Sequence, residues 1–138
     1  MKLYRDIVKR GLDFFAVLIT APLWCALLML IAIVVWIKMG GPVFFTQVRG
    51  GFRGKPIHLY KFRSMTNERD SKGTLLPDKE RLTRFGKFMR TTSLDEIPSI
   101  LNVLKGELSL VGPRPFIYDY MPLYSEHQKR RHEARPGI

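Results

Sequence analysis

The sequence predicts a mainly α-helical membrane protein with a small β-hairpin, and three features of its 138 residues support this prediction. Residues 14–37 form one uncharged apolar run. Two short β-prone runs follow it, joined by a glycine-rich basic stretch. Several later segments have the apolar spacing of amphipathic helices. We divide the chain into a membrane segment at residues 1–39 and a second domain at residues 40–138, because the length allows no more.

The chain is strongly basic, with 23 lysine and arginine residues against 12 acidic ones and a net charge of +11. This excess predicts polyanionic partners: nucleic acid, anionic lipid headgroups or phosphorylated small molecules. Cys25 is the only cysteine, so no intrachain disulfide can form. The histidines are scattered and have no cysteine partners, which argues against a zinc site at His58, His127 or His132.

The apolar run at residues 14–37 is longer than the roughly 20 residues that a membrane-spanning helix needs. Pro22 divides the run and is expected to bend it, and the Thr20 hydroxyl can bond a carbonyl that the proline frees. Basic residues flank the run on both sides, and the positive-inside rule places both flanks in the cytoplasm. These flanking residues are Lys2, Arg5, Lys9 and Arg10 before it and Lys38, Arg49, Arg53 and Lys55 after it. A kinked re-entrant helix satisfies both observations, and a proline-kinked span is about equally well supported.

The rest of the chain reads as short elements around surface loops. Residues 43–48 and 57–62 predict the two strands of the hairpin, and residues 66–79 predict a loop. Residues 80–90 predict an amphipathic helix, which beside a membrane segment favours a position in the interface. A core helix with a solvated basic face is the alternative. Residues 98–105 predict a helix that stops at Gly106, and residues 117–131 predict another.

Asp95 and Glu96 are adjacent acids within the stretch TTSLDEIP of this basic chain. Ser93 and Glu96 have the spacing of a capping box, so a helix start alone would explain the acids. Pro98 would distort that helix, and the alternative is a short turn around the acids that leads into a helix at Pro98. In both cases the carboxylates lie near free backbone N–H groups.

This acid pair suits phosphate chemistry. An aspartate can attack a phosphoryl group to form an acyl phosphate, and a second carboxylate can hold Mg²⁺ against phosphate oxygens. Basic side chains would neutralise the charge that develops during transfer. The candidates are Lys61, Arg63, Arg90 and Arg114. Each alone is explained as a solvated surface charge, and their occurrence with an acid pair and a membrane segment favours a site.

Several sequence blocks run in order along nearly the whole chain. They are KRGLDF, the apolar segment with its proline, PVFFTQVRGG, IHLYKFRSM, TRFGKFMRTTSLDEIPSILNVLKGELSLVGPRP and HEARPGI. Each block alone is a weak signal, but the ordered series is specific. By this series the chain resembles the monotopic phosphoglycosyl transferases, a bacterial sugar transferase family that starts glycan assembly on a polyprenol phosphate.

The resemblance implies a two-step transfer. Asp95 would attack the β-phosphate of a UDP-sugar, release UMP and carry the phosphosugar covalently. A polyprenol phosphate, usually undecaprenyl phosphate, would then take the phosphosugar. Glu96, beside Asp95, would be tied to Mg²⁺, and Arg114 in the Pro-Arg-Pro motif would contact a phosphate or the nucleotide. Three further basic residues match family positions near the active site: Lys61, Arg63 and Arg90.

The resemblance also implies a monotopic protein at the cytoplasmic face of the bacterial inner membrane, with a re-entrant helix broken at a serine-proline pair. Here Ala21 and Pro22 occupy that kink, so the hydrogen bond of the serine is missing, and we expect Thr20 to replace it. Family members continue beyond the position of Ile138. The resemblance therefore implies a catalytic domain that is truncated at its C-terminus.

The expected partners are a UDP-sugar donor, a polyprenol phosphate acceptor and an anionic phospholipid membrane. No helix-turn-helix, RNA-binding sheet motif or zinc finger is visible, which argues against nucleic acid. The alternative function is a catalytically incomplete membrane-bound fragment or a lipid-binding scaffold of the same fold. The sequence leaves open the sugar, the glycan pathway and the oligomeric state, a homo-oligomer included.

Overall fold

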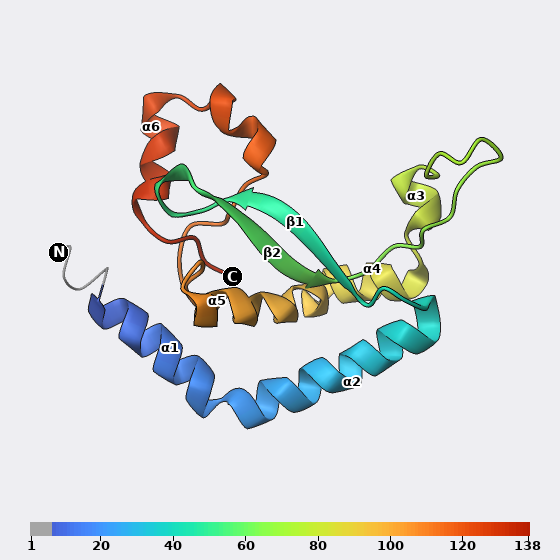
Figure 1. The fold of residues 1–138 in the computed structure, drawn as a ribbon, viewed down its shortest axis with the longest axis horizontal. Helices are drawn as coiled ribbons and strands as arrows, with labels where there is room; N and C mark the ends of the chain where they lie inside the picture. The colour runs from blue at the N-terminus through green and yellow to red at the C-terminus, as the bar shows by residue number, and fades with distance from the viewer. Residues whose placement is uncertain (1–6) are drawn as a thin grey trace.

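The computed structural model describes residues 7–138, so Lys2 and Arg5 of the basic N-terminal flank lie outside the described residues. The chain is mostly helical with one two-stranded sheet (Figure 1). The strands are β1 (Phe44–Gly50) and β2 (Pro56–Phe62). The helical elements, where η marks a 3₁₀ turn, are α1 (Lys9–Ile19), α2 (Ala21–Met39), η2 (Phe52–Gly54), α3 (Asp78–Arg81), α4 (Arg84–Thr91), η3 (Leu94–Ser99), α5 (Ile100–Lys105), η4 (Tyr118–Leu123), α6 (Glu126–Lys129) and η5 (Arg130–Glu133).

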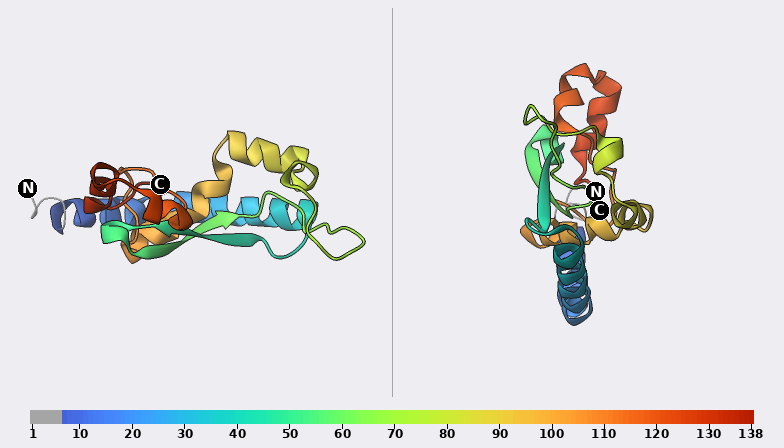
Figure 2. Two further views of the ribbon diagram at one scale, coloured as in Figure 1. Left: turned by 90° about the horizontal axis from the view of Figure 1, so that it is seen from above. Right: turned by 90° about the vertical axis from the view of Figure 1, so that its right-hand side faces the viewer.

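Helices α1 and α2 form a bent pair that projects as a separate layer from the rest of the protein (Figure 2). The vertex of the bend points away from the sheet, while the start of α1 and the end of α2 both lie on the sheet side (Figure 1). Helix α2 is long and apolar enough to cross a membrane, and most large apolar side chains of the pair are exposed. An exposed apolar surface of this extent indicates contact with lipid or protein rather than water.

The bend lies at Thr20, between the two helices, with Pro22 in the first turn of α2. Two side chains bond carbonyls in the last turns of α1. The Thr20 hydroxyl donates to Ala16 O at 2.8 Å, and Trp24 Nε1 donates to Val17 O at 2.8 Å. Thr20 therefore bonds a carbonyl, but not one that the proline frees: Ala16 O also accepts from Thr20 N at 3.2 Å, whereas Pro22 lacks the N–H for Leu18 O. The part played by Trp24 was not expected. Such bonds make a break tolerable in lipid, where water cannot satisfy the backbone.

The predicted hairpin is confirmed, with strand ends shifted by one or two residues. The strands β1 and β2 pair antiparallel, with Phe45 opposite Lys61 and Arg49 opposite Ile57. Because directly opposed residues point to the same face, all four side chains share one face of the sheet. The side chain of Asn102 in α5 binds the edge of β2, accepting from Tyr60 N at 3.1 Å and donating to the carbonyl of His58 at 2.8 Å.

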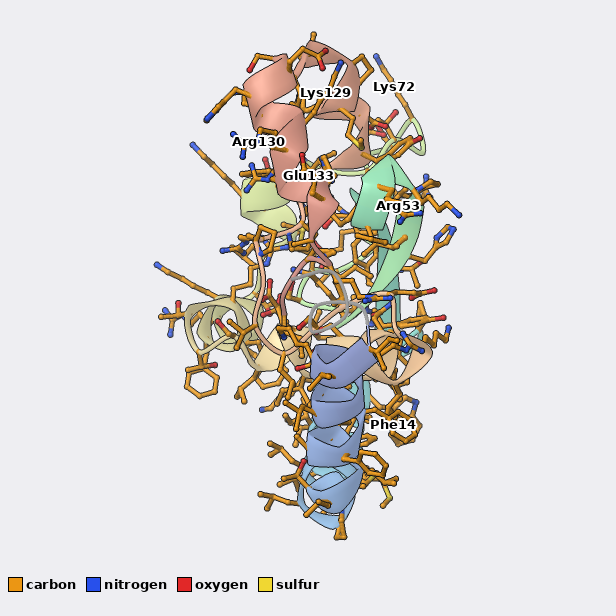
Figure 3. The ribbon with its side chains drawn as sticks, turned by 90° about the vertical axis from the view of Figure 1, so that its left-hand side faces the viewer. Phe14, Arg53, Lys72, Lys129, Arg130 and Glu133 are labelled. Atoms are coloured by element: carbon orange, nitrogen blue, oxygen red, sulfur yellow. The ribbon has the colours of Figure 1, made fainter. Side chains whose placement is uncertain are left out.

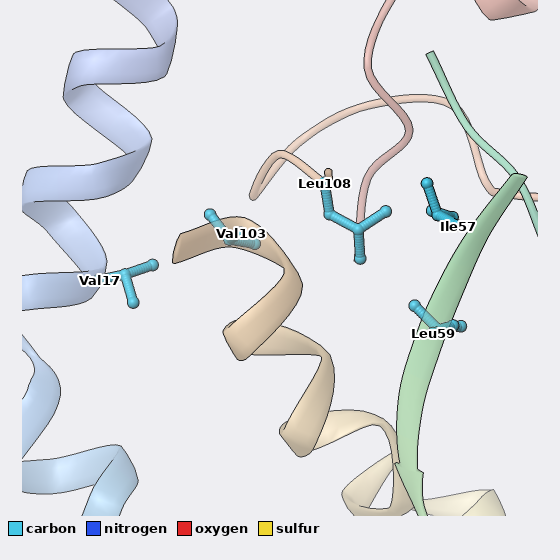
Figure 4. Packing of buried hydrophobic residues seen from close by; sticks show 5 residues of the cluster. All are labelled: Val17, Ile57, Leu59, Val103 and Leu108. Carbon is cyan, nitrogen blue, oxygen red and sulfur yellow. The ribbon is translucent and has the colours of Figure 1, made fainter. Parts of the chain in front are cut away.

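Two small apolar cores join the helix pair to the remaining chain. The first consists of Val17 from α1 with residues of β2, α5 and the loop after it: Ile57, Leu59, Val103 and Leu108 (Figure 4). The second consists of α2 residues with one residue each from β2 and α4: Ile31, Val35, Phe62 and Met89. Full burial of such side chains contributes about 1.5–3 kcal/mol each. The cores therefore hold the exposed helix pair against the sheet.

The prediction of one helix at residues 80–90 is wrong, since two helices occur there. Helix α3 ends at Arg81, and Thr83 caps α4 by accepting a hydrogen bond from Gly86 N at 2.9 Å. A threonine that bonds its own backbone in this way favours a helix start over helix continuation. Gly86 is required there, because a Cβ would lie 1.8 Å from Ser64 O.

Two other predicted helices also differ in extent. The segment expected to be helical from Pro98 begins earlier as the 3₁₀ turn η3 and becomes α-helical only at Ile100, because Pro98 lacks the N–H that an α-helix needs. It stops at Gly106 as predicted, with φ of 77°. The single helix predicted at residues 117–131 is wrong. Pro122 lies inside η4, and a capping box at Ser125 starts the separate helix α6.

Candidate active site

A cleft of about 660 Å³ lies between the sheet, η3 and the loop around Arg114. Phe44 and Phe45 line one end, beside the end of α2, and both are about half exposed. Gln47 and Arg49 lie further along β1, and Arg114 faces them. A strand rises about 3.3 Å per residue, which separates Phe45 from Arg49 by about 13 Å. Aromatic rings therefore line the cleft beside α2, together with Lys61 opposite Phe45, while Arg49 lies further along the strand.

Glu96 is the charged hub of this cleft. Its Oε1 accepts a hydrogen bond from Lys61 Nζ at 2.7 Å and lies 3.5 Å from Arg114 Nη2. Burial would raise the pKa of Glu96, but the hydrogen bond from Lys61 and the charges of Lys61, Arg114 and Arg49 outweigh it, so the pKa is lowered. Glu96 is therefore a stable carboxylate at neutral pH.

Asp95 lies next to this hub in a different environment. It is buried, with 7% of its surface exposed, and within the described residues no cation forms an ion pair with it. Burial raises the pKa of Asp95 and the Glu96 charge adds to the effect, while Lys61 and Arg90 lower it in part. The two adjacent acids are thus distinguished by their surroundings: Glu96 is tied to cations and Asp95 is left unpaired at the cleft wall.

The predicted capping box of Ser93 and Glu96 does not form. Ser93 has φ of 57° and its side chain makes no cap hydrogen bond, while the Glu96 side chain bonds Lys61 instead. The alternative, a short turn around the two acids, is the one that occurs. The Ser99 hydroxyl closes this turn by donating to Glu96 O at 2.6 Å. The local backbone therefore presents both acids without using their side chains as caps.

The structure brings Lys61, Arg90 and Arg114 to the same cleft as the acid pair. Arg90 Nε donates to the hydroxyl of buried Ser64 at 2.9 Å, which fixes its guanidinium. The Arg114 side chain is 78% exposed and lies between Pro113 and Pro115, so it keeps most of its donors free. Free guanidinium donors above a carboxylate pair form a suitable site for phosphate oxygens.

Arg63 lines the cleft but uses its guanidinium elsewhere. It is only 7% exposed, and it donates to carbonyls at the end of α2: those of Met39, Gly40 at 2.6 Å and Gly41 at 2.9 Å. A cation at a helix C-terminus is favoured by the helix dipole. Arg63 therefore joins the end of α2 to the end of β2, and its expected contact with substrate stays a prediction.

Sequence reasoning missed Gln47, Arg49 and Ser64 as residues of the cleft. Arg49 was counted only as a flanking charge. The signal for the first two was present in the hairpin, because antiparallel pairing places Gln47 and Arg49 on the face of Lys61. No comparable signal marked Ser64, whose place depends on a contact with a distant helix.

The carboxylates of Asp95 and Glu96 are the candidate ligands for a metal ion in the cleft. Among residues 7–138 no group of three or more histidine, cysteine, aspartate or glutamate side chains could hold a metal ion. Mg²⁺ needs only one or two carboxylates when water and substrate phosphates complete its shell. Among residues 7–138 no cation forms an ion pair with the Asp95 carboxylate, and Glu96 binds Lys61 and Arg114 through Oε1, so the pair fits such a role.

Comparison with known proteins decides the family. A family model described as bacterial sugar transferase matches residues 4–138. The chain belongs to the bacterial sugar transferase family. The resemblance of its ordered motifs is thereby confirmed, and the acid pair and Arg114 lie within the matched region.

Several curated bacterial sugar transferase proteins are similar to the chain. An "Uncharacterized sugar transferase EpsL" of Bacillus subtilis is 56% identical over 132 residues, covering 96% of this chain and 65% of that protein. A "UDP-glucose:undecaprenyl-phosphate glucose-1-phosphate transferase" of Caulobacter vibrioides is 38% identical, covering 96% and 52%. A "UDP-N-acetylgalactosamine-undecaprenyl-phosphate N-acetylgalactosaminephosphotransferase" of Aeromonas hydrophila is also 38% identical, covering 95% and 32%. The chain thus spans two thirds or less of the length of these relatives.

Proposed function

We propose that this protein transfers a phosphosugar from a UDP-sugar to a polyprenol phosphate, the first membrane step of a bacterial glycan pathway. The named relatives act on UDP-sugars and undecaprenyl phosphate. The observation that carries the proposal for this chain is the unequal acid pair. Asp95 is buried and forms no ion pair with any cation of residues 7–138, while Glu96 is held by Lys61 and Arg114.

In the first step the ionised Asp95 carboxylate attacks the β-phosphorus of the donor. A bond forms between the carboxylate oxygen and phosphorus, the bond from phosphorus to the bridging oxygen breaks, and UMP leaves with that oxygen. The sugar phosphate is then held as an acyl phosphate on Asp95. The positive charges of Lys61 and Arg90 reduce in part the rise that burial causes in the Asp95 pKa and so favour the ionised nucleophile.

In the second step an oxygen of the polyprenol phosphate attacks the same phosphorus. The bond to Asp95 breaks, the carboxylate is restored and a polyprenol diphosphosugar is released. Arg114 and Arg90 would hold the phosphate oxygens in both steps, because both line the cleft and arginine charges neutralise transferring phosphoryl groups.

Glu96 and Asp95 would hold Mg²⁺ through their carboxylate oxygens. The metal would supply charge neutralisation at the phosphate oxygens. Lys61 orients Glu96 through the 2.7 Å hydrogen bond, so the carboxylate is fixed before substrate binds.

The membrane arrangement supports the same function. The basic residues Lys9 and Lys38 lie at opposite ends of the bent helix pair, and both ends lie on the sheet side (Figure 1). We propose that the pair enters and leaves the bilayer from the cytoplasmic face, where UDP-sugars are made. This re-entrant position would leave the exposed rings of Phe44 and Phe45, which line the cleft, beside the helix that reaches the lipid.

The test is UMP release from a panel of UDP-sugars by the purified chain in detergent or nanodiscs with Mg²⁺. Asp95→Asn should reduce release by about 10³-fold or more, since loss of a nucleophile has effects of this size. Intact mass spectrometry without acceptor should show a phosphosugar adduct on the wild type and none on Asp95→Asn.

Asp119→Asn is the matched control, because Asp119 is an exposed acid that does not line the cleft. It should keep wild-type turnover. Wild-type release with an undiminished Asp95→Asn rate would reject the role of Asp95. Absence of both turnover and adduct with every donor would favour the alternative, a lipid-binding scaffold of the same fold.

A further inference from the structure

Arg49 lines the cleft near the end of β1 that is further from α2. Its Nη2 donates to Gln47 Oε1 at 2.6 Å, and its Nη1 reaches Pro115 O at 3.5 Å. Its Nε is buried and has no hydrogen-bond partner among residues 7–138, and no carboxylate in that range forms an ion pair with it. Its hydrogen bonds therefore go to neutral oxygens, with the charge of Glu96 acting only at a distance, and such a half-buried guanidinium is costly unless something else compensates it.

The cations around Arg49 make this imbalance larger. Arg49, Lys61, Arg114 and Glu96 all line a second cavity of about 110 Å³ next to the cleft. Their three positive charges meet the single negative charge of Glu96, which leaves an excess of two. Burial lowers the pKa of Arg49 and the charge of Arg114 lowers it further, while Glu96 opposes this in part. The two guanidinium groups repel each other until an anion lies between them.

From this geometry we infer that Arg49 is a further substrate contact, which with Arg114 binds the diphosphate of the nucleotide-sugar donor. The inference rests on the proposed transferase function and adds a residue to the donor site. A diphosphate carries a negative charge on each phosphate, so it can lie between the two guanidinium groups and relieve their repulsion. The planar guanidinium fork binds such oxygens in pairs. The contact of Nη1 with Pro115 O also ties Arg49 to the Pro-Arg-Pro segment that carries Arg114.

The position of Arg49 favours the donor over the acceptor. A polyprenol phosphate carries a phosphate of similar charge, so charge alone does not separate the two. The polyprenol chain stays in lipid, and the end of the cleft beside α2 is lined by the exposed rings of Phe44 and Phe45. Arg49 lies four residues further along β1, about 13 Å from that end. The water-soluble diphosphate therefore has the shorter route to Arg49.

The experiment measures UDP binding by calorimetry, and donor and acceptor kinetics, for the full chain in detergent micelles. Arg49→Gln should raise the Kd for UDP and the KM for the UDP-sugar by about tenfold or more, the size expected for a charge-assisted hydrogen bond. The KM for polyprenol phosphate should stay unchanged. Arg49→Lys keeps the charge but loses the fork, so its Kd should lie between those of wild type and Arg49→Gln.

Lys55→Gln is the matched control, since Lys55 is an exposed cation of the same hairpin that lines neither cavity. A Kd for UDP in Arg49→Gln equal to that in Lys55→Gln would overturn the inference, with transferase activity left intact. A rise in acceptor KM with donor KM unchanged would also overturn it. If Arg49→Gln fails to fold, the Kd of Arg49→Lys for UDP replaces it. A value equal to that of Lys55→Gln would again overturn the inference. Arg49-dependent UDP binding in a chain that releases no UMP would support the inference and contradict the transferase proposal.

Discussion

The helix pair and the cleft place their side chains by opposite rules. On α1 and α2, large apolar side chains such as Ile19 and Leu23 are 78% and 75% exposed. Around the cleft, the charged side chains of Arg63 and Asp95 are each only 7% exposed. In water the exposed apolar surface of the helices would cause aggregation. Burying charged side chains costs folding free energy unless hydrogen bonds or opposite charges compensate it.

This difference shows that the two regions are built for different surroundings. Phe14 lies on α1 at one end of the molecule, and the charged residues of α6 and η5 lie at the opposite end: Lys129, Arg130 and Glu133 (Figure 3). We propose that lipid covers the apolar surface, and that hydrogen bonds and an anionic substrate compensate the buried charges. The two apolar cores contain residues from both regions and hold them together. The cleft therefore stays at a fixed distance from the apolar surface.

The strongest test of this coupling is Arg63, which belongs to both regions. Arg63→Ala removes the donors to three carbonyls at the end of α2 and leaves a cavity beneath them. We expect the free energy of unfolding to fall by about 3 kcal/mol, since bonds to a charged group contribute about 1.5–3 kcal/mol each and water recovers part of the loss. Thermal unfolding in detergent micelles measures this.

Arg69→Ala is the control for Arg63, because the exposed Arg69 makes one hydrogen bond within a loop, to Gly73 O. Its effect should stay below about 0.5 kcal/mol. Arg63→Lys should remain destabilised, since one ammonium cannot reproduce the spread of the guanidinium. Equal stability of Arg63→Ala and Arg69→Ala would show that the two regions are not coupled through this residue.

The next largest effect is expected at the apolar surface itself. Leu30 in α2 is 60% exposed, and Leu30→Lys places a charge on the surface assigned to lipid. A lysine at the centre of a membrane helix costs about 2.5–3.5 kcal/mol, so membrane partitioning should fall by about 100-fold. Liposome flotation measures the change. Leu75→Lys, at an exposed leucine in the loop before α3, should leave partitioning unchanged. Equal flotation of both variants would remove lipid as the explanation.

Sequence alone predicted the parts of this comparison that depend on local composition. The apolar run, the proline bend and the hairpin follow from short-range patterns, and they are present. Helix ends were missed where one side chain or proline interrupts a pattern, as Thr83 and Pro122 do. Within the cleft, Asp95 and Glu96 were found because an acid pair is rare in so basic a chain. Arg49 was missed as a cleft residue and Arg63 was given a different contact, because both depend on partners far away in sequence.

A smaller effect on stability is expected from the buried carboxylate of Asp95. Burial raises the pKa of Asp95, so the folded protein binds its proton more tightly than the unfolded chain does. Stability from this group is full below the unfolded pKa and is lost as pH rises through the folded pKa. Asp95→Asn should therefore raise the melting temperature at neutral pH, and the difference should shrink in acid. A lower melting temperature than that of Asp119→Asn at neutral pH would contradict this account.

The smallest effect is expected at the bend of the helix pair. Thr20→Val keeps the shape of the side chain but removes the hydroxyl that donates to Ala16 O at 2.8 Å. Hydrogen bonds in membrane helices contribute about 0.6 kcal/mol, so we expect a slight loss of stability and a minor population with altered topology.

Cysteine labelling at positions 10 and 55 in a Cys25→Ser background reports on which side of the membrane each flank lies. Thr20→Ser should restore the wild-type result because it restores the donor. Identical labelling and stability in Thr20→Val and wild type would leave Trp24 Nε1, at 2.8 Å from Val17 O, as the side-chain support of the bend.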